Sequence, residues 1–125
     1  MAHRSSDDYR AAEQRGRTAE QITKWIYRLG GYRCLGQRIK TPFGEIDLCM
    51  ARGNQLFVLE VKYHKKPELG PESAVPAPKQ VRRIRNAISW YVARNANLKD
   101  KQIIIRLVQW NSWRQFKQTD ISFLF

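Results

Sequence analysis

Two periodicities alternate along the chain, and each predicts one kind of element. Between residues 10 and 29 the apolar positions recur three or four residues apart, at Ala19, Ile22, Ile26 and Leu29. This spacing is typical of one face of an α-helix. Gly30 and Gly31 follow directly, as expected at a helix C-terminus. We therefore predict a helix over 10–29 that packs through this apolar stripe, after a flexible polar arm over 1–9.

The remaining chain switches between strand and helix spacing. Segments rich in β-branched and aromatic residues predict strands over 32–40, 44–51, 55–63, 102–110 and 116–125, and residues 79–95 return to helical spacing. Strands joined by short turns pair antiparallel, whereas a helical crossover supplies the connection that a parallel neighbour needs. The expected fold is therefore α/β, a central mixed β-sheet flanked by helices in the order αβββαββ. The proline-rich stretch 67–78 is expected to be a connector or a lid.

Length and charge narrow the class of protein. A chain of 125 residues fits one domain, which we expect over 10–125. Lys and Arg number 23 against 11 Asp and Glu, a net charge of +12, and such an excess favours nucleic acid as a partner over a basic surface without a polyanion. Apolar runs are far shorter than the about 20 residues of a membrane span. The two cysteines lack CxxC spacing and suit a reducing compartment, so we expect no membrane association and a cytoplasmic location.

Acidic residues in two neighbouring predicted strands form the most informative pattern. Alternation along a strand places Glu45 and Asp47 on one face, opposite Ile46 and Leu48, and likewise places Glu60 and Lys62 on one face. If Gly53 and Asn54 form a two-residue hairpin turn, Asp47 faces Glu60 directly. The register therefore predicts a pair of carboxylates beside a lysine.

Paired carboxylates repel each other unless one is protonated or a cation lies between them. Mg²⁺ or Mn²⁺ is a suitable cation, because Mg²⁺ takes oxygen ligands and is commonly held by one or two carboxylates plus a substrate phosphate. Asp47 and Glu60 are then the metal ligands, and Lys62 stabilises charge on the reacting phosphate. The alternative is a solvated strand face with ordinary cross-strand ion pairs.

Four segments together resemble the small bacterial YraN-like proteins, the family designated UPF0102. They are Gly44-Glu45-Ile46-Asp47-Leu48, Phe57-Val58-Leu59-Glu60-Val61-Lys62, Gly16-x-x-Ala19-Glu20 with Gly31-Tyr32, and Val75-x-x-x-Lys79-x-x-Arg82. The resemblance covers roughly residues 12–122 and implies a restriction-endonuclease-like fold of the PD-(D/E)XK class, related in architecture to archaeal Holliday-junction resolvases. It also implies that Asp47 is the motif aspartate, that Glu60 and Lys62 are its (D/E)xK, and that Glu20 is the acidic residue of the first helix.

Further residues are candidates for nucleic-acid contacts. Lys79 and Arg82 open the second predicted helix, where its N-terminal dipole also favours phosphate. Arg38 and His64 flank the acidic strands. Each has a plainer alternative as a solvated surface residue, and Glu20 could instead pair with Lys24 one helical turn later.

These observations lead to two hypotheses. The first is a metal-dependent nuclease that hydrolyses DNA phosphodiester bonds, including structure-specific cleavage of branched DNA, with Asp47, Glu60, Lys62 and Glu20 as catalytic residues. The alternative is a non-catalytic nucleic-acid-binding module of the same fold. A homodimer is a further expectation, formed through the apolar Ile103–Ile105 run or the Phe123–Phe125 end.

Overall fold

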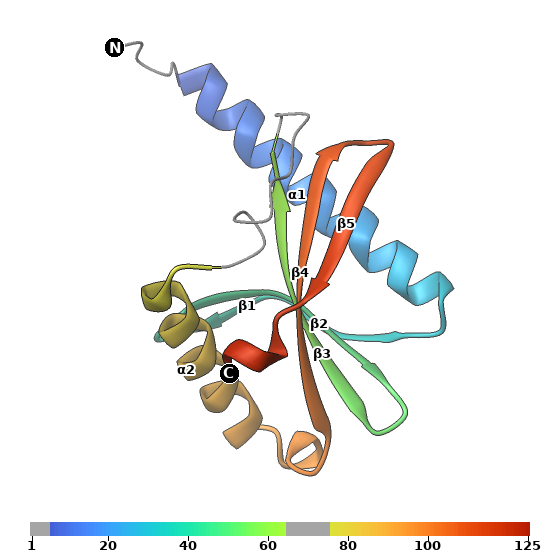
Figure 1. The fold of residues 1–125 in the computed structure, drawn as a ribbon, viewed down its shortest axis with the longest axis vertical. Coiled ribbons are helices and arrows are strands. Elements are labelled where there is room, and N and C mark those ends of the chain that lie inside the picture. Colours follow the sequence, from blue (N-terminus) through green and yellow to red (C-terminus); the bar gives the residue numbers. More distant parts are fainter. Residues whose placement is uncertain (1–5, 65–75) are drawn as a thin grey trace.

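The computed structural model describes residues 6–64 and 76–125 and arranges them as a five-stranded sheet with a helix on each face (Figure 1). The predicted order αβββαββ is confirmed, with short 3-10 helices added after the second long helix and at the C-terminus. The elements are α1 (Ser6–Leu29), β1 (Arg33–Thr41), β2 (Gly44–Arg52), β3 (Gln55–Tyr63), α2 (Pro78–Ala93), η2 (Ala96–Leu98), β4 (Gln102–Ser112), β5 (Gln115–Asp120) and η3 (Ser122–Leu124).

The sheet is mixed, as the short turns and the helical crossover predict. Its strands lie in the order β1-β2-β3-β4-β5. The pairs β1–β2, β2–β3 and β4–β5 are antiparallel, whereas β3 and β4 run parallel. The connection from β3 to β4 passes through α2, which is the crossover that a parallel pair requires. As a result β3 lies at the centre of the sheet, with neighbours on both sides.

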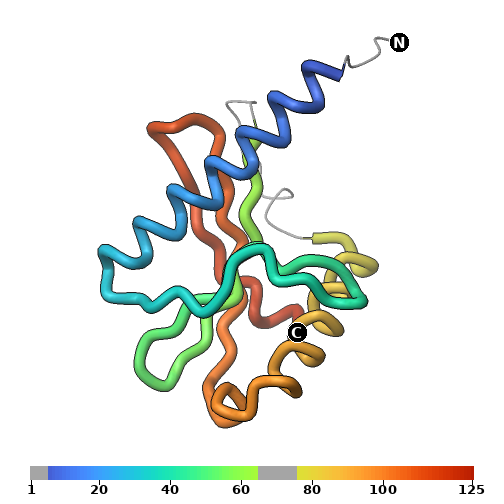
Figure 2. Tube along the Cα trace, turned by 180° about the vertical axis from the view of Figure 1, so that it is seen from behind, coloured from blue at the N-terminus to red at the C-terminus, as the bar shows by residue number. Residues whose placement is uncertain are grey.

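The sheet separates two hydrophobic clusters. One contains Ile84 and Ile88 of α2 together with Leu56 and Val58 of β3. The other contains Ala19 and Tyr27 of α1 together with Phe57, Leu59 and Val61 of β3. Alternate residues of β3 therefore serve opposite clusters, which explains why this strand is apolar at nearly every position. Figure 2 shows α1 crossing the sheet, with its N-terminal half extending beyond the strands.

Helix α1 buries a face that coincides only in part with the one that its apolar residues predict. Ile26 is 37% exposed and Leu29 86% exposed, whereas Glu20, Thr23 and Tyr27 are buried. Polar contacts fix this orientation, because the buried Trp110 indole N–H donates a hydrogen bond to Thr23 Oγ1 at 3.0 Å. The expected apolar stripe is therefore confirmed only in its first half, because Ala19 is buried and Ile22 packs against the same cluster, whereas Ile26 and Leu29 are exposed. The buried face is rotated to include Glu20, whose carboxylate faces the sheet.

Element boundaries also differ from the prediction at both ends of the chain. Residues 6–9, assigned to the polar arm, form the first turn of α1, and Asp7 and Asp8 stabilise this N-terminal turn through the helix dipole. At the other end β5 stops at Asp120, whose carboxylate accepts a hydrogen bond from the Ser122 N–H at 2.8 Å. Residues 1–5 of the predicted arm and residues 67–75 of the predicted connector lie outside the described residues.

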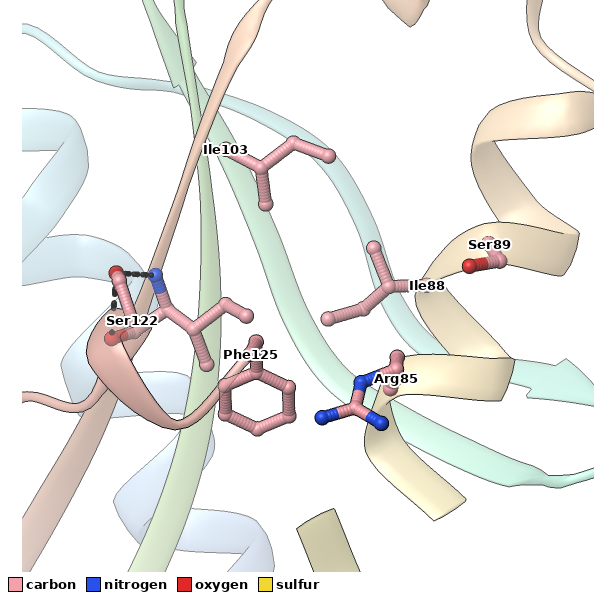
Figure 3. Close-up of a pocket in the computed structure, with 7 residues that line it drawn as sticks. Arg85, Ile88, Ser89, Ile103, Ser122 and Phe125 are labelled. Atoms are coloured by element: carbon pink, nitrogen blue, oxygen red, sulfur yellow. Dashed lines mark hydrogen bonds between the residues drawn. The ribbon is translucent and has the colours of Figure 1, made fainter. Parts of the chain in front are cut away.

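The apolar segments expected at a dimer interface lie largely against the protein itself. Ile103 and Ile105 belong to β4, between β3 and β5, and line a pocket of about 230 Å³ together with Ile88 and Phe125 (Figure 3). Phe123 alone among the large apolar residues of these segments is strongly exposed, at 76%. No helix in the described ranges 6–64 and 76–125 combines the length and apolar character needed to cross a membrane.

The difference in burial predicts a large effect for one leucine truncation and a small effect for another. Leu59→Ala removes a side chain that is 0% exposed, so the free energy of unfolding should fall by about 2–5 kcal/mol. Leu29→Ala removes a side chain that is 86% exposed and should change it by less than about 0.5 kcal/mol. Urea unfolding followed by circular dichroism measures both, and a comparable loss in Leu29→Ala would contradict the orientation of α1.

Candidate active site

The candidate site begins where the pairing of β2 with β3 ends. The predicted hairpin is confirmed, with Arg52 opposite Gln55 and Gly53 at φ +58°. The pairing continues as far as Leu48 opposite Leu59 and then stops. Asp47 and Glu60 come next along each strand, so they lie at the point where the strands separate.

Beyond this point β2 pairs only with β1, and its side chains change surroundings. Ile46 and Leu48 were expected on one face of the sheet, but Ile46 packs in the cluster of α2 and Leu48 in the cluster of α1. The change falls where β2 leaves β3 and continues as a two-stranded ribbon with β1, and such ribbons twist more strongly than wide sheets. The expectation of a shared face for these two residues was therefore wrong.

Asp47 replaces the missing backbone pairing with its side chain. Its Oδ2 accepts a hydrogen bond from the Val61 N–H at 2.8 Å. Burial raises the pKa of Asp47, while this hydrogen bond and the positive charges of Lys62 and Arg83 oppose the rise. The hydrogen bond fixes the Asp47 carboxylate beside β3, within electrostatic reach of Glu60.

Glu60 is the most deeply buried carboxylate of the candidate site, with 2% of its surface exposed. Burial, followed by the negative charge of Asp47, raises its pKa to about 8. Its Oε1 has no hydrogen-bond partner within the described part of the chain. A buried carboxylate oxygen without a partner carries a desolvation cost, and a cation or a proton would offset it.

Lys62 is exposed, two residues after Glu60 on β3. Its positive charge lowers the pKa of both Asp47 and Glu60. The predicted grouping of Asp47, Glu60 and Lys62 is therefore present in the structure. The lysine is the member of this group that solvent and a substrate can reach.

Glu20 reaches the same place from helix α1. It is 9% exposed, and its pKa rises to about 7, first through burial and then through the negative charge of Asp47. The alternative pairing with Lys24 is not formed, because the Lys24 ammonium donates a hydrogen bond to Gln37 Oε1 at 3.1 Å. Glu20 therefore belongs to the electrostatic environment of Asp47.

Arg38 connects two acidic residues of this region. Its Nε lies 4.0 Å from Glu20 Oε1 and 3.7 Å from Glu45 Oε2. Arg38 adopts a φ of +51°, a left-handed conformation that is uncommon for a residue with a side chain. The guanidinium predicted to contact nucleic acid is thus held by carboxylates and is about one third exposed.

Arg83 of α2 is the site residue that the sequence did not single out. Its Nη1 donates a hydrogen bond to the Glu45 carbonyl at 3.3 Å, and its Nη2 lies 3.8 Å from Glu60 Oε2. Gly44 leaves room for this side chain, because a Cβ there would lie 2.7 Å from Arg83 Nη1. The one signal in the sequence is that Arg83 directly precedes Ile84, which faces the core.

The other predicted nucleic-acid contacts lie outside this group. Lys79 and Arg82 are exposed in the first turns of α2, and His64 is exposed after β3, where its backbone N–H donates to the Trp110 carbonyl at 2.7 Å. Within the described ranges, no ion pair or hydrogen bond joins these three side chains to the carboxylates. They are available to a ligand from the surface.

The donor chemistry of the group fits a hard divalent cation, but the ligand set is small. Among residues 6–64 and 76–125, no three His, Cys, Asp or Glu side chains converge as a ready-made metal site. Asp47 and Glu60 supply carboxylate oxygens, and Oε1 of Glu60 is unpartnered. Mg²⁺ is held in proteins by as few as one or two carboxylates when water and phosphate complete its shell.

The fold and this group define an α/β protein with a basic surface and a pair of carboxylates, one half-buried and one buried, at the point where two strands separate. The chain matches the sequence profile of "Uncharacterised protein family UPF0102" over residues 19–118. It therefore belongs to the UPF0102 family, as the four motifs predict. The matched region includes every predicted catalytic residue.

Several relatives support this membership. The chain is 39% identical over 97 residues to a UPF0102 protein of Caulobacter vibrioides, covering 78% of this chain and 74% of the relative. A UPF0102 protein of Parvibaculum lavamentivorans is 38% identical over 90 residues, 72% of this chain and 66% of that relative. One of Rhizorhabdus wittichii is 52% identical over 52 residues, 42% and 44% respectively. The match thus spans less than two thirds of these last two relatives.

Glu60 is predicted to make the protein less stable as the pH rises. Its pKa in the folded protein, about 8, exceeds the ordinary value of 4.5. The folded state therefore keeps a proton that the unfolded state loses, and this stabilisation, complete below pH 4.5, disappears as the pH approaches 8. Relative to wild type, Glu60→Gln should gain at least about 1 kcal/mol in free energy of unfolding between about pH 5 and pH 8.

Urea unfolding in the presence of a chelator measures this difference across the pH range. Glu13→Gln is the matched control, because the side chain of Glu13 is 60% exposed and lies on α1. Parallel pH profiles for wild type and Glu60→Gln would show that Glu60 does not hold a proton in the folded protein.

Proposed function

We propose that this protein is a metal-dependent nuclease that hydrolyses phosphodiester bonds of DNA, with a restriction-endonuclease-like fold of the PD-(D/E)XK class. The observation that carries the proposal is the pair of half-buried Asp47 and buried Glu60, with one unpartnered Glu60 oxygen, beside an exposed lysine. In a protein of net charge +12 that only bound polyanions, these carboxylates would weaken binding because their negative charge repels phosphate. A divalent cation held by the carboxylates would offset that repulsion.

In this proposal Asp47 and Glu60 hold Mg²⁺ or Mn²⁺. The bound metal would polarise the phosphate and lower the pKa of a coordinated water. Hydrolysis forms a bond between the water oxygen and phosphorus and breaks one phosphorus–oxygen ester bond, leaving a phosphomonoester and a hydroxyl group. Lys62 donates hydrogen bonds to the phosphate oxygens as their negative charge increases.

Two further residues support the pair. Glu20, with a pKa near 7, can exchange a proton at neutral pH beside Asp47, which suits general acid or base work. Arg83 acts as a positioning residue, because it connects Glu60 to the backbone of β2. Lys79, Arg82, Arg38 and His64 are proposed to contact the DNA backbone outside the reacting phosphate.

The proposed substrate also bears on the location and the assembly of the protein. A cytoplasmic location is proposed with this substrate, since the relatives come from bacteria, where the DNA lies in the cytoplasm. Branched DNA is proposed as one substrate, and a homodimer as the assembly that would cut two strands, with exposed Phe123 available for that contact.

A non-catalytic nucleic-acid-binding module is the second candidate, and one observation favours it. Without a metal, burial and then the negative charge of Asp47 raise the pKa of Glu60 to about 8 and that of Glu20 to about 7. At neutral pH these side chains carry less negative charge than ordinary carboxylates, so they repel a phosphate less. Metal binding and cleavage separate the two candidates.

Metal binding should depend on Asp47. Titration calorimetry with Mg²⁺ or Mn²⁺, in the presence of a short duplex, should show binding to wild type. In Asp47→Asn the metal affinity should fall by at least about 10-fold, because one of two charged ligands is lost. Asp100→Asn, an exposed control beyond η2, should bind like wild type. Absence of binding to the wild type would exclude the metal enzyme.

Cleavage should depend on Lys62. Labelled duplex, flap and four-way DNA substrates are incubated with wild type, Lys62→Ala and the exposed control Lys99→Ala, with Mg²⁺ or Mn²⁺. Lys62→Ala should lower the cleavage rate by roughly 10²–10³, as expected when one stabiliser of the transition state is lost, while Lys99→Ala should not. Cleavage that persists undiminished in Lys62→Ala would reject the assigned site, and no cleavage by wild type on any substrate would favour the binding module.

A further inference from the structure

A second feature lies at the opposite end of strand β2 from the carboxylates. The turn after α1, the start of β1 and the β2–β3 hairpin come together there, on the same side of the molecule in both views (Figures 1 and 2). They enclose an open hollow of about 720 Å³, which we call the basic hollow. Its lining includes Arg28, Arg33 and Arg52, together with Tyr32 and Cys34.

The basic hollow has three arginines and no acidic residue in its lining. Arg28, Arg33 and Arg52 are all exposed, and none of them forms an ion pair with a carboxylate of residues 6–64 or 76–125. The contrast with the candidate active site is clear, because Arg38 and Arg83 lie within 4.0 Å of carboxylate oxygens there. The positive charge of the hollow is therefore not neutralised by neighbouring side chains.

Aromatic rings hold two of these arginines in place. The Arg52 guanidinium carbon lies 4.4 Å from the centre of the Tyr32 ring, and that of Arg28 lies 4.7 Å from the Trp25 ring. Tyr32 is itself fixed by edge contacts with Tyr27 and Phe57, at 4.8 and 4.9 Å between ring centres. Stacking restricts the guanidinium groups but leaves their N–H donors available.

Further features extend the positive surface and keep it open. Lys101 donates a hydrogen bond from its ammonium to the Gly53 carbonyl at 3.0 Å, which places another cation at the rim. Gly31 and Gly53 lie in the two turns with φ of +93° and +58°, and a Cβ at either would meet nothing within 4 Å. The backbone of both turns is thus accessible to a large ligand.

The chemistry of the hollow selects phosphate groups. Planar guanidinium groups form paired hydrogen bonds with phosphate oxygens, and several unpaired guanidinium groups together favour a ligand with several negative charges. Arg52 lies five positions after Asp47 on β2, which corresponds to roughly 17 Å along an extended strand. A ligand that reaches both places must be long, and a polynucleotide has one phosphate about every 3.4 Å along each strand.

We propose that the basic hollow binds the phosphate backbone of a nucleic acid, as a second contact site separate from the carboxylate pair. It shares with the proposed function only the nucleic-acid partner and does not require cleavage. The hollow orients a bound polynucleotide through backbone contacts, while any chemistry takes place at the other end of β2.

Salt dependence of DNA binding tests the proposal without any cleavage. Binding of a fluorescein-labelled duplex of about 30 base pairs is measured by anisotropy over a range of salt concentrations, in the Asp47→Asn background and without divalent metal. The double variant Arg28→Gln/Arg33→Gln removes two charges from the hollow. The matched control Arg94→Gln/Lys99→Gln removes two exposed charges around the end of α2.

The slope of log K against log salt should become about 2 units less steep in the hollow variant, since each phosphate contact contributes about 0.9. The control should change the slope by less than half as much. Equal changes in both variants, or none in the hollow variant, would overturn the proposal. The Asp47→Asn background is used without divalent metal, so this experiment measures binding and not cleavage. A negative result therefore rejects the hollow and not the nuclease proposal, and a negative result in the Lys62 cleavage experiment does not reject the hollow.

Cys34 gives a local readout, because it is half-buried in the hollow whereas Cys49 is fully buried. Duplex DNA should slow alkylation of Cys34 by iodoacetamide at least about threefold, and this protection should disappear in Arg28→Gln/Arg33→Gln. Inorganic pyrophosphate serves as the second probe. Protection by pyrophosphate without protection by DNA would assign the hollow to small polyphosphates and overturn the proposal, as would no protection by DNA.

Discussion

The hydrogen bond from the Val61 N–H to the carboxylate of Asp47 is the contact on which the candidate site depends. The β2–β3 ladder ends one pair earlier, at Leu48 and Leu59. The Asp47 carboxylate therefore accepts the hydrogen bond of a backbone N–H that strand pairing would otherwise satisfy. A buried backbone N–H without a partner would be costly. The same contact brings a second carboxylate next to Glu60 on the central strand.

The electrostatic properties of the site follow from this placement. Glu60 and Glu20 have raised pKa values because burial and the charge of Asp47 act on both, whereas Lys62 and Arg83 favour ionisation of Glu60. Helix α1 contributes Glu20 and helix α2 contributes Arg83, although the sheet separates the two helices elsewhere. The separation of β2 from β3 is where side chains from both layers act on the same carboxylates.

Much of this arrangement could be predicted from the sequence because it rests on local rules. Alternation along β3 and a two-residue turn at Gly53 were enough to group Asp47, Glu60 and Lys62. The orientation of α1 was predicted only in part, because the apolar stripe carries no information on the hydrogen bond between Trp110 and Thr23, 87 residues apart, that lies on the buried face. The role of Arg83 was missed for the same reason, since its contacts with Glu45 and Glu60 form only when the crossover brings α2 against the sheet. The basic hollow joins two turns and the start of β1, which only the folded chain brings together.

The parallel pairing of β3 with β4 also has a consequence for how the chain folds. These strands are neighbours although Gln55 and Gln102 are 47 residues apart, so the pairing requires closure of a long loop and is expected to form late. The β1–β2–β3 meander needs only short turns and can form first. Glu60 is expected to stay hydrated and ionised until the crossover docks on β3, because Arg83 of α2 lies against its carboxylate in the folded protein. Docking of the crossover and uptake of a proton by the acidic pair are therefore one kinetic step, and its rate should depend on pH.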